Sequence, residues 1–403
     1  MQYGRIYNQY KKELEAFKNI RNPEKFPGID KYLLGIDVCS AENTMPTWVF
    51  KDLFENARDG TDELSYDGNK VPFQSLSFTC HTGEDFRHLM SGIRAIYEVV
   101  NYFKFHAGDR IGHGLALGFD PYYWYKNNET VLLPRIEALE NYVWAYKILS
   151  IYSNNQNYLN SQYLIHRINE LSKEIVGDSY IPVEIWVDAY DYLFSLSFEE
   201  VLKSYKNKCL HCQECNNYNG KNYKNIKNQC SILRNIGKDN VKYDKKDILH
   251  MYHCSKYNMK MREPIHYKIP EQELEIIVEV QKILKHIVSD KGIVIEANPN
   301  SNVTITDIDM LGQHPLYNIS SEKCDDKNIL TCINSDNPGI FNTNVVNEIG
   351  FTYFTMIEKG IGRDACEQWI ERLIDIGMKY SFIRRQETDE YILEELEYLI
   401  SIL

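Results

Sequence analysis

The chain has 403 residues, 43% hydrophobic and 13% aromatic, so it can build a large core in one or two domains and is not predicted to be disordered. Its formal net charge of −12 argues against a general binder of nucleic acid or of membrane surfaces, because both kinds of protein usually present a basic face. The N-terminus lacks a signal-peptide pattern, and no apolar run is long enough to predict a transmembrane helix. We therefore expect a cytoplasmic protein with reduced cysteines.

Helical and strand patterns alternate along much of the chain. An amphipathic helix is predicted first, over residues 5–20. Short apolar runs then predict five buried strands, at residues 32–39, 76–80, 109–115, 293–297 and 331–334. Helices are predicted between them at 86–103 and 271–288. This βαβ alternation is typical of a parallel sheet with helices outside it.

Polar residues follow four of the five predicted strands at their C-terminal ends, where both (β/α)₈ barrels and doubly wound sheets carry their chemistry. A doubly wound sheet usually has a glycine-rich phosphate turn, and neither GxGxxG nor GxxxxGK[ST] occurs here. We therefore predict a (β/α)₈ TIM-barrel-type domain built from residues 1–120 and 271–403. Residues 121–270 are predicted to be one large, mostly helical insertion, and 364–403 two or three amphipathic helices.

Four segments carry the residues expected to do chemistry. His81 precedes Glu84 by three residues, directly after a predicted strand, and His113 lies between glycines in RIGHG. The third segment is EANPNSN at 296–302, with a His-Pro pair further on, and the fourth places Asp336 at a strand end. Two histidines and one aspartate from different strand ends make a plausible Zn²⁺ site, with Glu84 left for acid–base work. Each segment alone is a weak signal, since a single His or Asp at a strand end is more often structural or solvated.

The segments HTGED, DRIGHGL, EANPNSN, HPL and NSDNP, in this order, resemble the adenosine and AMP deaminase family of metal-dependent hydrolases. YLLGIDVCSAE is similar to the strand that precedes them in that family. The longer runs FTCHTGEDFRHLMSGIRAIYE and GDRIGHGLALGFDPYYW resemble the deaminases of phage-defence systems, first those of the RADAR type and next the CRISPR-associated deaminases. The resemblance covers about residues 30–120 and 290–390 and leaves out the insertion.

The resemblance implies a role for each matching residue. His81 and Asp336 would be Zn²⁺ ligands, Glu84 the proton donor to purine N1, and His113 the residue that orients or deprotonates the metal's water. The implied reaction is hydrolytic deamination of adenosine or an adenine nucleotide, ATP or dATP, to the inosine product. The substrate-binding residues it implies are Ser40, Gly83 and Asn337, the last where many relatives have an Asp that contacts purine N7.

The chain departs from the family in one major respect. The family takes two more metal ligands from an HxH pair on its first strand, and no HxH occurs in this sequence. We therefore expect a barrel that is incomplete at its N-terminal side, with the other part supplied by a second polypeptide, unless the chain is a fragment. A non-catalytic scaffold or binding subunit with a degenerate pocket is the alternative from another class. A deaminase of another purine, adenine or AMP, also stays open.

The insertion carries a second candidate zinc site. Cys209, Cys212 and Cys215 have the spacing C-x₂-C-x₂-C, and Cys230 follows. A polar loop with reduced thiols explains the same pattern. The resemblance further implies a homo-oligomer with an ATPase partner, and neither a membrane nor a nucleic acid is expected as a partner.

Overall fold

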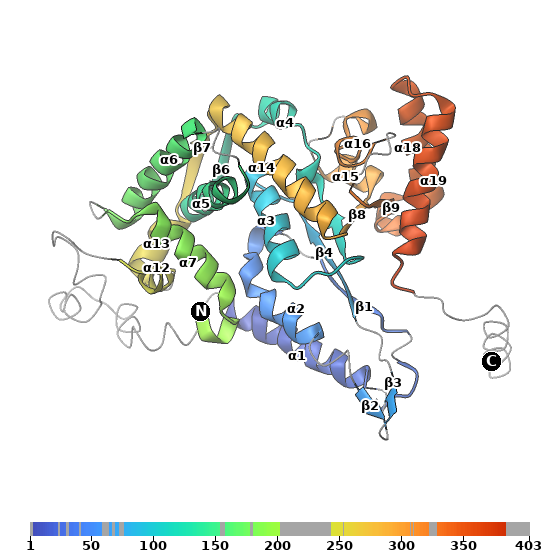
Figure 1. Ribbon diagram of the computed structural model, residues 1–403, viewed down its shortest axis with the longest axis horizontal. Coiled ribbons are helices and arrows are strands. Elements are labelled where there is room, and N and C mark those ends of the chain that lie inside the picture. Colours follow the sequence, from blue (N-terminus) through green and yellow to red (C-terminus); the bar gives the residue numbers. More distant parts are fainter. Residues whose placement is uncertain are drawn as a thin grey trace.

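The fold is a mixed α/β arrangement with helices packed around a parallel sheet (Figure 1). The computed structural model describes residues 3–22, 25–29, 32–39, 42–58, 64–66, 69–71, 76–153, 158–177, 180–201, 243–252, 254–306, 308, 310–321 and 329–383. Among these residues, no helix combines the length and the apolar composition that crossing a membrane requires.

Five parallel strands form the main sheet. They are β1 (Gly35–Val38), β4 (Ser77–Thr82), β5 (Arg110–His113), β8 (Val294–Ala297) and β9 (Thr331–Ile333). Their order in space is β1-β4-β5-β8-β9, which is also their order along the chain. All four neighbouring pairs are parallel, so the five carboxyl ends meet at one edge of the sheet.

The helices vary from one turn to five turns in length. They are α1 (Gly4–Ile20), α2 (Lys51–Arg58), α3 (Leu89–Tyr102), α4 (Pro121–Asn127), α5 (Arg135–Tyr152), α6 (Tyr158–Val176), α7 (Val183–Ser195), α12 (Lys245–Met251), α13 (Ser255–Arg262), α14 (Glu271–Asp290), α15 (Pro299–Ile305), α16 (Leu316–Ile319), α17 (Pro338–Phe341), α18 (Val345–Glu358) and α19 (Arg363–Lys379). Short 3₁₀ turns are η2 (Glu42–Thr44), η3 (Thr47–Val49), η4 (Leu115–Leu117) and η5 (Leu311–Gln313).

One face of the sheet lies under helices. In β4 the side chains of Phe78, Cys80 and Thr82 are buried, whereas the alternate residues, His81 among them, are only half-buried. Helix α3 packs against the buried side of β4, and α14 packs against α3. The two-residue period of a strand therefore gives β4 a core face and a more open face, and His81 is on the open one.

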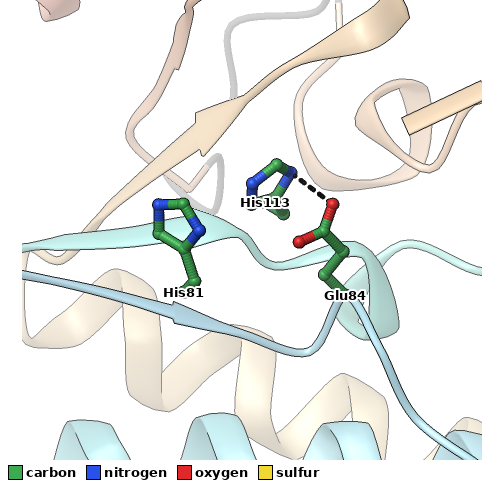
Figure 2. A group of neighbouring side chains, drawn as sticks. All are labelled: His81, Glu84 and His113. Atoms are coloured by element: carbon green, nitrogen blue, oxygen red, sulfur yellow. Dashed lines mark ion pairs between the residues drawn. The ribbon is translucent and has the colours of Figure 1, made fainter. Parts of the chain in front are cut away.

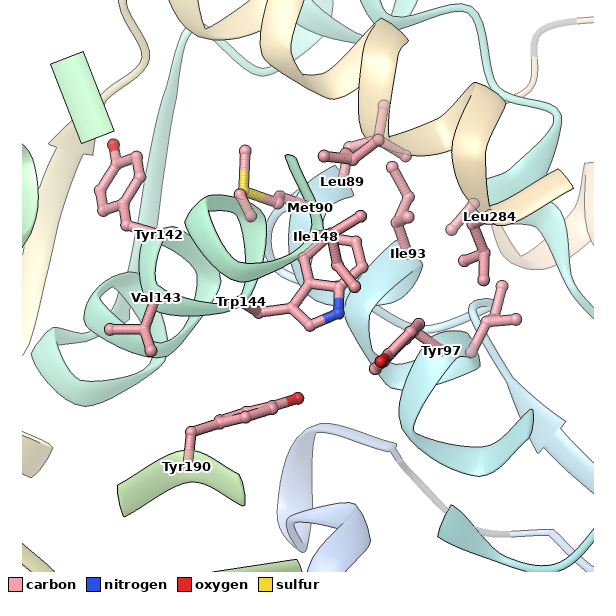
Figure 3. Close-up of a cluster of buried hydrophobic side chains, with 14 of the residues drawn as sticks. Leu89, Met90, Ile93, Tyr97, Tyr142, Val143, Trp144, Ile148, Tyr190 and Leu284 are labelled. Atoms are coloured by element: carbon pink, nitrogen blue, oxygen red, sulfur yellow. The ribbon is translucent and has the colours of Figure 1, made fainter. Parts of the chain in front are cut away.

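The helices of residues 121–270 share the core of the sheet's helical layer. Trp144 of α5 is fully buried and packs with Tyr97 of α3 at a ring-centroid distance of 5.7 Å. Figure 3 shows these two side chains among the apolar residues of α3, α5 and α14. The region is thus joined to the sheet by one continuous hydrophobic cluster.

Two smaller strand pairs accompany the main sheet. β2 (Leu64–Tyr66) pairs with β3 (Asn69–Val71), and β6 (Thr130–Pro134) pairs with β7 (Pro264–Lys268), both antiparallel. β6 and β7 bring the two ends of the inserted region together.

The helices predicted over residues 5–20, 86–103 and 271–288 are present as α1, α3 and α14. All five predicted strands are present, each within about three residues of its predicted bounds. The prediction that all five are buried is wrong for β1, which lies at the edge of the described sheet and has no buried residue. Strands β6 and β7 were not predicted, because residues 121–270 were expected to be mostly helical. Helix α18 was also missed, and α19 is the one described helix of the predicted C-terminal set, since 384–403 lie outside the described residues.

Candidate functional site

Three predicted site residues meet at the carboxyl edge of the sheet. His81 is the next-to-last residue of β4, Glu84 follows in the next loop, and His113 ends β5. One ligand-capable atom from each lies within 4.8 Å of those from the other two, so the group could hold a metal ion (Figure 2). The parallel register explains the proximity, because Gly112 is paired with His81 and Thr82 with His113.

Gly112 of the RIGHG segment makes room for His81, and Gly114 takes part in the turn that follows β5. A Cβ at Gly112 would lie 2.6 Å from Cδ2 of His81, so a side chain there would displace the imidazole. His113 has a φ of +66° and Gly114 a φ of +57°, and this left-handed pair ends the strand. The backbone therefore turns sharply at His113, whose side chain is 1% exposed.

Glu42 holds the loop that carries Glu84. Its carboxylate accepts hydrogen bonds from the backbone N–H groups of Gly83, Glu84 and Asp85 at 2.7, 2.8 and 3.1 Å. Three successive backbone donors thus converge on one carboxylate. The carbonyl oxygen of Gly83 accepts from the backbone N–H of Ala116, so both backbone polar groups of this glycine have protein partners.

Glu84 and His113 form a close acid–base pair. Oε1 of Glu84 lies 3.0 Å from Nδ1 of His113. Burial, followed by the negative charges of Glu42 and Asp336, raises the pKa of Glu84 to about 7. Burial, followed by the nearby His81, lowers the pKa of His113 to about 4. At neutral pH the imidazole is therefore neutral, and the carboxyl group can carry a proton.

Two buried amides surround His113. Nδ2 of Asn302 lies 2.7 Å from Nδ1 of His113, and Nδ2 of Asn298 lies at 3.3 and 3.4 Å from the two ring nitrogens. Both come from the EANPNSN segment, which ends β8 and begins α15. His314 contacts the other end of the Asn302 amide, with its Nε2 3.1 Å from Oδ1 of Asn302.

Asp336 and Asp37 add negative charge on the open side of the site. Asp336 follows β9 with a φ of +55°, and its Oδ2 accepts a hydrogen bond of 2.6 Å from Ser301. Oδ2 of Asp37, on β1, lies 3.6 Å from Nε2 of His81. Burial raises the pKa of Asp37, His81 opposes that shift, and Glu296 and Asp336 add to it. Asp37 and Asp336 belong to the two outer strands of the sheet, β1 and β9, or to the residues just after them.

The donor chemistry of this group suits a divalent metal ion. Imidazole nitrogen and carboxylate oxygen are donors that such ions, Zn²⁺ among them, accept, and His81, Glu84 and His113 supply both. The half-buried imidazole of His81 faces the carboxylate of Asp37 rather than a backbone group. A positive ion there would offset the carboxylate charge that gathers around it.

The remaining predicted residues divide into two groups. Asn337 caps the short helix α17, with its Oδ1 accepting from the N–H groups of Gly339 and Ile340. Purine N7 is a hydrogen-bond acceptor, so the contact that the resemblance implies for Asn337 would use the amide nitrogen at the other end of the side chain. Ser40 and the four cysteines of the second zinc site, Cys209, Cys212, Cys215 and Cys230, lie outside the described residues.

Sequence reasoning missed several residues that shape the site, above all Glu42 and Asp37. Both lie in or directly after the GIDVCSAE strand, where acidic residues at the end of a buried run were the available signal. Ser301 and Asn302 were included in a motif without a role.

A scan against protein-family models and a search of curated proteins found no match to this chain. Functional inference therefore depends on the site's geometry and on the motif resemblance.

Proposed function

We propose that the chain is part of a zinc-dependent hydrolase that deaminates adenosine or an adenine nucleotide. The observation that carries this proposal is the convergence of His81, Glu84 and His113 at one sheet edge, with Asp336 near enough to raise the pKa of Glu84. A metal ligand, a protonated acid and a neutral imidazole within one site are what hydrolytic deamination requires.

The order of the strands supports a barrel over a doubly wound sheet. A doubly wound sheet reverses its strand order at a switch point, whereas these five strands lie side by side in chain order. Because parallel crossovers are right-handed, such an order places the connecting helices on one face. We propose that the five strands are an arc of a (β/α)₈ barrel, whose active site lies at the carboxyl ends.

The proton chemistry is assigned to Glu84 and His113. Glu84 would donate its proton to N1 of the purine, which makes C6 more electrophilic. Its raised pKa suits this role, because a carboxyl group with its usual pKa would be ionised at neutral pH. His113, which lies beside both Glu84 and His81, would orient the attacking water (Figure 2).

His81 and Asp336 would hold the metal. Zn²⁺ bound there would supply a nucleophile derived from water near neutral pH. Catalytic zinc normally has at least three protein ligands, and the sequence has no HxH pair to add two more. We propose that a segment with such a pair, in the same protein or in a second polypeptide, supplies the other ligands.

The resemblance adds the biological setting. It supports a role in anti-phage defence, in the cytoplasm, as a homo-oligomer with an ATPase partner. The absence of HxH favours a second candidate function, a non-catalytic binding subunit with a degenerate deaminase pocket. The presence of all four residues His81, Glu84, His113 and Asp336 favours the enzyme, since a scaffold would not need this combination.

The test is to co-express the chain with the reading frames that flank its gene. The purified material is assayed for bound zinc and for ammonia released from adenosine, AMP, ATP and dATP. We expect zinc and ammonia in the co-expressed sample and little of either with the chain alone. No ammonia from any of the four substrates, with or without the flanking products, would overturn the proposal.

A further inference from the structure

Neutral His113 can carry its proton on either ring nitrogen, and the two forms present opposite groups to the site. Nδ1 faces Glu84 and Asn302. In Figure 2 the other ring nitrogen points away from Glu84, toward the side of His81. The position of the proton therefore determines whether His113 offers a donor or a lone pair to that side.

A chain of hydrogen bonds that leads to His113 begins at a backbone group. The N–H of Leu316 donates to Nδ1 of His314 at 3.0 Å, so this nitrogen must be an acceptor. His314 is 2% exposed, and burial lowers its pKa to about 3, so the ring is neutral and its single proton is on Nε2. That proton is donated to Oδ1 of Asn302 at 3.1 Å.

The orientation of the Asn302 amide follows from this bond. Because its oxygen faces the N–H of His314, its Nδ2 faces His113, at 2.7 Å from Nδ1. The same Nδ2 lies 3.3 Å from Oε1 of Glu84. Asn302 is 0% exposed, so no solvent-facing alternative competes for these bonds. An amide nitrogen only donates, so Nδ1 of His113 accepts and its proton is on Nε2.

We propose that His314 and Asn302 are positioning residues that hold neutral His113 in its Nε2–H form. Asn298 does not select a form by itself, since its Nδ2 is nearly equidistant from both ring nitrogens. We call the hydrogen-bond chain from Leu316 through His314 and Asn302 to His113 the relay. Its role in catalysis rests on the proposed function, whereas its hydrogen bonds do not.

The Nε2–H form separates two roles for His113. A histidine that ligates a metal through Nε2 presents Nδ1–H to an acceptor. Here the Asn302 amide donates to Nδ1, and the carboxyl group of Glu84, 3.0 Å from the same nitrogen, is an acceptor for Nδ1–H only when it is ionised. His113 is therefore a hydrogen-bond donor toward the His81 side rather than a ligand or a base. A donor there orients an attacking water and holds its lone pair toward the substrate.

The test is nitrogen-15 NMR of the metal-free full chain with labelled histidine at neutral pH. The His113 signals are assigned by their loss in His113→Asn. We expect Nδ1 of His113 to appear unprotonated and Nε2 protonated. A protonated Nδ1 in the wild-type chain would overturn the proposal.

Asn302→Asp sharpens the test because it is nearly the same size. One carboxylate oxygen still accepts from His314, and the other now presents an acceptor to His113, so Nδ1 should gain a proton. His314→Phe removes the donor that orients Asn302, and His113 should then populate both forms. Asn300→Asp, on the same helix but bonded to Thr343, is the matched control and should leave His113 unchanged.

An Asn302→Asp chain that is folded and keeps Nδ1 unprotonated would contradict the relay. If this variant does not fold, the wild-type spectrum still decides. Neither result depends on activity: a chain without deaminase activity can show the relay, and an active enzyme can lack it.

Discussion

Oε1 of Glu84 lies 3.0 Å from Nδ1 of His113, and the surroundings of the two groups shift their pKa values in opposite directions. Both shifts favour the neutral form, because burial penalises a carboxylate and an imidazolium alike. Near neutral pH the titratable proton that the pair shares is therefore held by the carboxyl group of Glu84, and the imidazole of His113 is neutral.

This pair predicts how stability changes with pH. The pKa of Glu84 is about 7 in the folded chain and near 4.5 when unfolded, so its contribution to stability is complete below pH 4.5. It is lost as the pH rises to about 7, because the folded state then holds a proton that the unfolded state has released. Glu84→Gln should remove this loss, which is about 3 kcal/mol at most.

The measurement is denaturant unfolding of the wild type and of Glu84→Gln at pH 4.5 and pH 8. The variant should be relatively more stable at pH 8 than at pH 4.5. Glu371→Gln, at an exposed position on α19, should show no such difference. An equal effect of Glu84→Gln at both pH values would count against the raised pKa.

Glu42 should be needed to hold the Glu84 loop. Glu42→Gln replaces one carboxylate oxygen by an N–H donor that faces backbone N–H groups, and should cost about 1–3 kcal/mol of unfolding free energy. Asp85→Asn, which changes a neighbouring exposed carboxylate, should cost much less. Comparable losses of unfolding free energy for both variants would show that the hydrogen bonds of Glu42 to the Glu84 loop contribute little to stability.

Gly112→Ala should damage metal binding more than it damages the fold. Its Cβ would lie 2.6 Å from the His81 ring, which must rotate away from its present position. We expect weaker zinc binding by titration of the co-expressed complex, with a small change in melting temperature. Gly350→Ala, where a Cβ meets nothing within 4 Å, is the control and should bind zinc as the wild type does.

The Arg58–Asp109 ion pair should stabilise the start of β5. Asp109 accepts two bonds from Arg58 and one each from the backbone N–H groups of Phe78 and His106. Both side chains are about 5% exposed, so Arg58→Met leaves a buried carboxylate without its counter-ion. The loss should be about 3–5 kcal/mol in denaturant unfolding, whereas the exposed Arg5→Met should change little.

Local sequence patterns predicted the five strands of the main sheet well, but they did not predict the antiparallel pair β6 and β7. The five strands are short apolar runs with polar ends, and this local signal is preserved in the fold. Strand β6 pairs Thr130 with Lys268, a contact across the whole inserted region that no neighbouring residue indicates. Its apolar residues fit a helix equally well, so only the pairing distinguishes the two.

The site was also predicted only in part, because local motifs are visible in the sequence and long-range contacts are not. His81, Glu84 and His113 stand in short motifs at strand ends and could be recognised singly. Their proximity depends on register, and the contacts of Glu42 and Asn302 join residues 41 and 189 positions apart. Such contacts exist only after the chain has folded.

The most direct test of the central claim compares Glu84→Gln with Glu371→Gln in the co-expressed complex. The rate of ammonia release from the preferred substrate is measured at neutral pH, with bound zinc determined in parallel. If Glu84 is the proton donor, its variant should retain zinc and lose about 10²–10⁴-fold in rate, while Glu371→Gln keeps the wild-type rate. A Glu84→Gln complex that deaminates as fast as the wild type would contradict the account.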